Sequence, residues 1–78
     1  MNKRECYLFF AGYYMVSAAS SVLCRNNIDN RIVRAPAYMQ KSCSFAALID
    51  ESDEKDCLRL LEKERIVILH REYREKRA

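Results

Sequence analysis

Residues 31–50 read RIVRAPAYMQKSCSFAALID, and they contain the only proline of the chain. The β-branched run before Pro36 predicts a strand near residues 30–35, and the apolar run after it predicts another near 44–50. Proline lacks an N–H group and restricts the residue before it, so the segment between the runs is predicted to be a loop. The second run is apolar on both faces, which is typical of a central strand.

The flanking sequence repeats a strand and a helix on each side of this hairpin. An aromatic run ends at Gly12 and is followed by an amphipathic stretch that stops at Asn26 and Asn27, because asparagine tolerates a left-handed helix cap. After the hairpin, acids crowd the start of a second helix, and a final apolar run follows it. The predicted order is strand 5–11, helix 13–26, strand 30–35, strand 44–50, helix 51–64 and strand 66–71.

The order βαββαβ predicts an α+β, ferredoxin-like fold, with a four-stranded antiparallel sheet and two helices on one face. The chain has 78 residues, of which 50% are hydrophobic and 32% charged, so a single globular domain over 1–78 is expected. Its core is predicted to span about 5–71. The net charge of +3 lies in residues 65–78, and residues 72–78 are predicted to form a charged tail.

The four cysteines are widely spaced and include no CxxC pair, so neither a zinc site nor another cofactor is expected. Free cysteine buries like a small hydrophobic residue. Cys6, Cys24 and Cys57 fall in predicted strands or helices, and we expect them in or near the core. Free thiols indicate a reducing compartment, and we predict a cytoplasmic protein.

Residues 6–24 contain no charge, and Lys3 and Arg4 precede them, a pattern that a signal peptide or a short membrane span also shows. The run contains several serines and divides into a strand and an amphipathic helix. We therefore favour a soluble domain, and a membrane partner is not expected.

Cys43 lies at the end of the polar loop, outside any apolar periodic run. Arg34 and Lys41 are nearby cations, and a cationic environment favours the thiolate form of cysteine. The competing interpretation is a half-buried structural cysteine at the start of a strand. No Ser/His/Asp set and no Gly-rich phosphate loop is present, so a conventional enzyme is not expected.

In several of these features the chain resembles a small bacterial family of selenium- or sulfur-carrier-like domains, some of which are fused to TusA-like domains. The resemblance covers roughly Tyr7 to Arg71. It rests on four features: an aromatic strand ending in phenylalanine, a helix with a small buried residue, a turn into a β-branched strand, and a proline followed by a Ser-Cys pair. They are Phe10, Ala18 or Ala19, Asn27-Ile28, and Pro36 with Ser42-Cys43. The family usually has glycine after the cysteine, where this chain has Ser44.

The resemblance implies a sulfur or selenium carrier in which the Cys43 thiol holds the transferred atom as a persulfide or selenide. It also implies a sulfur- or selenium-donor protein as partner. The residues predicted around the carried atom are Arg34, Pro36, Lys41, Ser42 and Ser44.

An alternative function is a small interaction or regulatory module that dimerises through its sheet. A sheet with helices on one face leaves the other uncovered, here with Tyr7 or Phe9 on it, and an apolar face needs a partner. We therefore predict a homo-oligomer, most simply a dimer. A nucleic-acid binder that stacks bases on sheet aromatics is the third reading, and it is not expected, because the third strand offers no cation.

Overall fold

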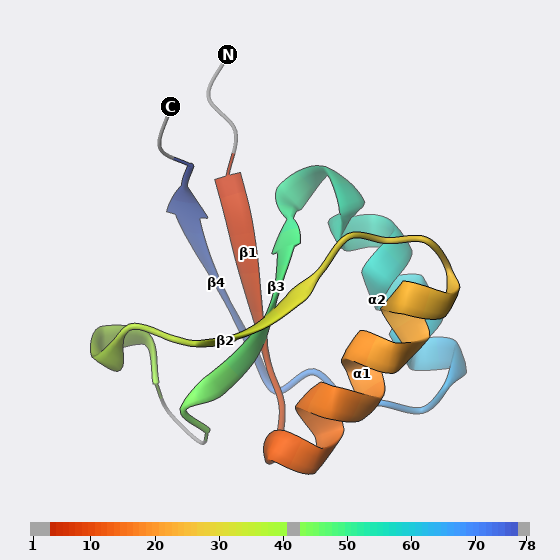
Figure 1. The fold of residues 1–78 in the computed structure, drawn as a ribbon, viewed down its shortest axis with the longest axis horizontal. Helices are drawn as coiled ribbons and strands as arrows, with labels where there is room; N and C mark the ends of the chain where they lie inside the picture. Colours follow the sequence, from red (N-terminus) through yellow and green to blue (C-terminus); the bar gives the residue numbers. More distant parts are fainter. Residues whose placement is uncertain (1–3, 41–42, 77–78) are drawn as a thin grey trace.

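The computed structural model describes residues 4–40 and 43–76. Within these ranges, four strands form one antiparallel sheet in the order β2-β3-β1-β4, and two helices lie beside it (Figure 1). This arrangement confirms the predicted ferredoxin-like α+β fold. The elements in chain order are β1 (Arg4–Phe9), α1 (Tyr13–Arg25), β2 (Arg31–Arg34), the 3₁₀ turn η1 (Ala37–Met39), β3 (Phe45–Asp50), the 3₁₀ turn η2 (Glu51–Asp53), α2 (Glu54–Lys63) and β4 (His70–Glu75).

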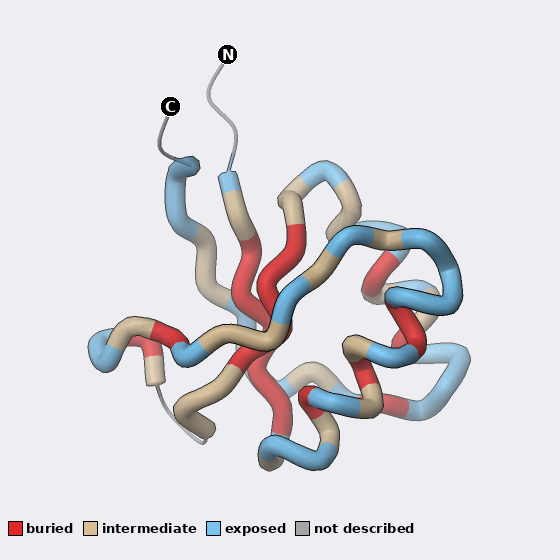
Figure 2. Tube along the Cα trace, viewed as in Figure 1, coloured by how far each residue is buried: buried red, intermediate tan, exposed pale blue. Residues whose placement is uncertain are grey.

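The central strands β1 and β3 are buried on both faces of the sheet (Figure 2). Cys6 lies opposite Ile49 and Tyr7 lies opposite Leu48. Because successive side chains of a strand point to opposite faces, the two pairs belong to different cores. We call them the helix-side core and the loop-side core.

The helix-side core packs α1 and α2 against the sheet. Each helix contributes the residues at helical spacing that the sequence pattern predicts, including Ala19 and Leu23 of α1 and Leu61 of α2. Burying a leucine side chain stabilises the fold by about 1.5–3 kcal/mol. The buried members of the helix-side core are Cys6, Leu8, Phe10, Val16, Ala19, Val22, Leu23, Ala47, Ile49, Cys57, Leu61 and Ile66.

The loop-side core covers the sheet face that was predicted to be open. The segment after β2 folds back over this face (Figure 1), and Met39 is 1% exposed. Tyr7 and Phe9 are consequently 2% and 0% exposed. The prediction that this sheet face is uncovered and drives self-association is therefore wrong. A dimer stays a prediction, and it would have to form through another surface. Neither ring is free to stack on a nucleic-acid base. The buried members are Tyr7, Phe9, Ala35, Met39, Ala46 and Leu48.

The fourth strand lies further along the chain than the predicted 66–71. Ile66 donates its N–H to the Leu61 carbonyl at 2.9 Å and packs in the helix-side core, as part of the connection that follows α2. The charged sequence 70–75 forms β4 instead, so residues 72–75 of the predicted tail belong to the sheet, and of that tail only Lys76 is described outside a strand. Charged residues are tolerated there because β4 is an edge strand with a neighbour on one side only.

The uncharged run 6–24 divides into β1 and α1, as predicted. In the part of the chain that the structure describes, no helix has both the length and the apolar character needed to cross a membrane. The Asp50 side chain accepts a hydrogen bond from the Ser52 backbone N–H at 2.9 Å and so caps the start of the second helical segment. That segment begins as η2 before it continues as α2.

Both helices end in a left-handed residue. Asn27 has φ 60° and Arg65 has φ 61°. In each case the next residue donates its N–H back to the helix, Ile28 to Leu23 and Ile66 to Leu61. This hydrogen-bond pattern is the Schellman motif, in which glycine is favoured at the left-handed position.

We expect Arg65→Gly to raise the free energy of unfolding by about 0.5–1 kcal/mol, because glycine adopts positive φ without the steric cost of a Cβ atom. Urea unfolding measures the change. Asn27→Gly is the matched control, and its gain should be smaller because asparagine already tolerates this conformation. A loss of stability in Arg65→Gly would contradict the assignment of strain to this residue.

Candidate functional site

The connection between β2 and β3 is closed at its base by hydrogen bonds among Ala35, Gln40 and Ser44. The Ala35 N–H donates to the Ser44 carbonyl at 2.8 Å, and Gln40 Nε2 donates to the Ala35 carbonyl at 2.7 Å. Ser44 Oγ donates to Gln40 Oε1 at 3.3 Å. These contacts hold the start and the end of the connection together. Ser44 was predicted as a site residue, whereas Gln40 was missed.

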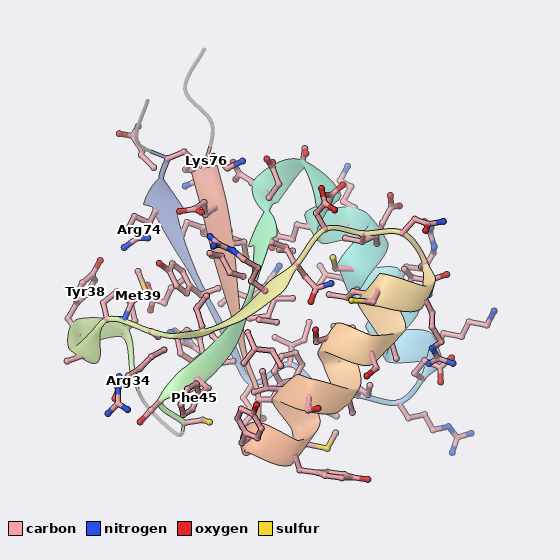
Figure 3. The ribbon with its side chains drawn as sticks, viewed as in Figure 1. Arg34, Tyr38, Met39, Phe45, Arg74 and Lys76 are labelled. Atoms are coloured by element: carbon pink, nitrogen blue, oxygen red, sulfur yellow. The ribbon has the colours of Figure 1, made fainter. Side chains whose placement is uncertain are left out.

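Pro36 and Met39 shape the first half of the connection. Pro36 has φ −55° and ψ 144°, and its carbonyl accepts the Met39 N–H at 2.9 Å, which forms the turn η1. Met39 packs into the loop-side core, whereas its neighbour Tyr38 is 77% exposed (Figure 3). The turn is thus fixed to the sheet by one buried side chain.

Cys43 immediately precedes the closed base. Its side chain is half-buried, carries a free thiol and packs against the helix-side core. The neighbouring Ser44 carbonyl is fixed by its hydrogen bond to Ala35. The thiol is therefore held on an ordered backbone and is partly accessible to solvent.

A cation and two aromatic rings lie together at the start of β3, next to Cys43 and Ser44 in the sequence. The Arg34 Cζ atom is 5.9 Å from the centre of the Phe45 ring, and Figure 3 shows both side chains at this end of the sheet. Tyr13 meets the same ring edge-on, with ring centres 5.3 Å apart and an angle of 79° between the planes. Arg34 and Phe45 are directly paired across the β2–β3 ladder. Of the predicted site residues, the structure brings Arg34, Pro36, Cys43 and Ser44 into this one connection, while Lys41 and Ser42 lie outside the described residues.

The remaining cysteines fall into two groups. Cys6 and Cys57 are 0% exposed, and burial raises the pKa of each thiol to about 12. Cys24 is exposed in the last turn of α1, so its predicted place in or near the core is wrong. Asn30 Nδ2 contacts the Cys24 sulfur at 3.5 Å. Accessibility alone therefore leaves two candidate thiols, Cys24 and Cys43.

The family comparison covers nearly the whole chain. A family model described as "Putative Se/S carrier protein-like" matches residues 5–70. No curated protein and no solved structure matches the chain. The match runs from the second residue of β1 to the first residue of β4, and it includes the complete connection that holds Cys43.

Proposed function

Because this chain belongs to the Se/S carrier protein-like family, we propose that Cys43 carries a sulfur or selenium atom between a donor protein and an acceptor. The observation that supports this role is the placement of a half-buried free thiol beside the closed base of the β2–β3 connection. Such a thiol can be reached by a partner while its backbone stays fixed. The proposed setting is a reducing, cytoplasmic compartment, in which the thiol stays free.

In the proposed loading step, the Cys43 thiolate attacks the outer sulfur of a persulfide on the donor protein. A new S–S bond forms on Cys43, the S–S bond of the donor breaks, and the donor leaves as a thiolate. The proton released by Cys43 is balanced by the proton that the donor thiolate takes up. No external oxidant or reductant is needed. In delivery, a thiolate of the acceptor attacks the outer sulfur of the Cys43 persulfide, and Cys43 leaves as a thiolate.

We assign supporting roles to the other residues of the connection. Positive charge favours the anionic form of a thiol or persulfide, which is the role proposed for Arg34 and Lys41. Pro36 directs the chain into η1, and Ser44 holds the closed base. The family motif supports Ser42 beside the thiol.

The test is to incubate the protein with a cysteine desulfurase and cysteine, and to measure the intact mass. We expect the wild-type chain to gain a sulfur atom and Cys43→Ala to gain none. Cys24→Ala is the matched control, because it removes an equally free but more exposed thiol, and it should load like wild type. Loading that is lost in Cys24→Ala and kept in Cys43→Ala would overturn the proposal.

A further inference from the structure

Strand β4 forms one outer edge of the sheet (Figure 1). It pairs with β1 over its full length, from His70 opposite Phe9 to Glu75 opposite Arg4. Within residues 4–40 and 43–76, no strand covers its other side. A free edge offers unpaired backbone N–H and C=O groups, which another strand can bond.

We propose that a second copy of this chain pairs with β4 along this edge, antiparallel and centred on Tyr73. The strand reads HREYRE. In this register Arg71 lies opposite Glu75 of the second copy, and Glu72 lies opposite Arg74. Opposite charges directly across an antiparallel ladder stabilise it, and like charges destabilise it.

The charges select this register over its neighbours. A one-residue shift is excluded, because it would turn every side chain of β4 to the other face of the sheet. A shift of two residues would place Glu72 opposite Glu72 of the second copy in one direction, and Arg74 opposite Arg74 in the other. The sequence of β4 is therefore complementary to itself in the centred register, which a partner of unrelated sequence would not match.

The contacts already made by these side chains are compatible with the pairing. Arg71 binds Glu54, and Arg74 Nη2 lies 3.5 Å from Glu5 Oε1. The two arginine side chains remain 42% and 48% exposed. A guanidinium group has several N–H donors, so each arginine can contact a second carboxylate.

A groove of mixed character lies beside the edge. It has a volume of about 490 Å³ and is lined by Leu58, Ile68 and Tyr73 together with the polar side chains of His70 and Arg71. Leu69 also lines it and is 53% exposed. Antiparallel pairing of two identical edges relates the copies by a twofold axis perpendicular to the sheet. Both α2 helices then lie on the same face of the joined sheet, and the groove end of β4 lies opposite Glu75 and Lys76 of the second copy.

The test uses two single charge reversals, Glu72→Arg and Arg74→Glu, with analytical ultracentrifugation over a concentration series. We expect the wild-type chain to dimerise, and each variant alone to dimerise at least about tenfold more weakly, because like charges then face each other. An equimolar mixture of the two variants should dimerise again, since residues 72 and 74 then face each other with opposite charges in both pairs of the mixed dimer. Arg25→Glu, a charge reversal in the last turn of α1, should leave the dimer unchanged.

Restoration by mixing separates the proposed interface from misfolding, because two misfolded variants would not rescue one another. A wild-type chain that stays monomeric at every concentration would overturn the proposal. So would a single variant that dimerises as tightly as wild type, or a mixture that shows no more dimer than its components.

Discussion

Replacing Met39 with alanine is expected to lower the free energy of unfolding by about 2–5 kcal/mol. Met39 is 1% exposed and joins the turn η1 to the loop-side core. The substitution leaves a cavity in the loop-side core, which also contains the rings of Tyr7 and Phe9. Chemical denaturation followed by circular dichroism measures the loss.

Tyr38→Ala is the matched control for this prediction, because it shortens the adjacent side chain of the same turn. Tyr38 is 77% exposed, so its removal should change the free energy of unfolding by no more than about 0.5 kcal/mol. Equal losses in the two variants would show that the turn is not anchored through Met39. The same pair of variants tests whether the anchored turn is needed to position Cys43. We expect slower sulfur loading in Met39→Ala and normal loading in Tyr38→Ala.

The second large effect is a loss of stability at alkaline pH. In the unfolded chain a cysteine thiol ionises near its ordinary pKa of 9.0, whereas burial raises the pKa of Cys6 and Cys57 to about 12 in the folded protein. The folded state therefore holds two protons that the unfolded state releases. The stability from this source is fully present below pH 9 and is lost as the pH rises toward 12. Each thiol should lower the free energy of unfolding by about 1.4 kcal/mol per pH unit in this window.

Urea unfolding at pH 7 and at about pH 10.5 measures this effect, and cysteine variants separate it from other titrations. Tyr73 also contributes above pH 10, because its hydrogen bond to Glu54 and its burial raise its pKa to about 12. Cys6→Ala and Cys57→Ala should each show a shallower loss with pH than wild type, whatever their stability at pH 7. Cys24→Ala should keep the wild-type slope. Identical slopes in all four proteins would contradict the assigned burial of the two thiols.

The sequence predicts most of the fold because its strongest local signals agree with the tertiary structure. The aromatic run of β1 and the apolar run of β3 are typical of central strands, and the apolar spacing in α1 has the period of a helix. Asn27 stops α1 in the left-handed conformation that its side chain tolerates. These signals depend on neighbours in the chain, which the sequence contains.

The errors arise where a distant part of the chain decides the structure. The apolar run that begins at Ile66 resembles a strand, but Ile66 packs in the helix-side core as part of a connection. The charged residues after this run form an edge strand, which pairs with only one neighbour. Met39 has no periodic partners, so nothing local indicates that it covers the second sheet face. Cys24 follows the buried Leu23 directly but lies on the solvent side of α1. It was predicted in or near the core because cysteine is usually buried.

The candidate site is predicted in part for the same reason. Cys43, Pro36 and Ser44 form a recognisable local pattern, and the structure places all three between β2 and β3. Gln40 closes that connection through hydrogen bonds to Ala35 and Ser44, and only the folded chain brings these groups together. A polar residue at the end of a short turn carries no distinct sequence signal.

Tryptic mapping of the loaded wild-type chain shows whether Cys43 is the residue that receives the transferred sulfur. Cleavage after lysine and arginine separates the thiols: Cys43 lies in the peptide 42–55, Cys57 in 56–59, and Cys6 with Cys24 in 5–25. After loading by a desulfurase and alkylation, we expect one added sulfur atom in the peptide 42–55. The added sulfur atom in the peptide 5–25, with an unmodified peptide 42–55, would contradict it.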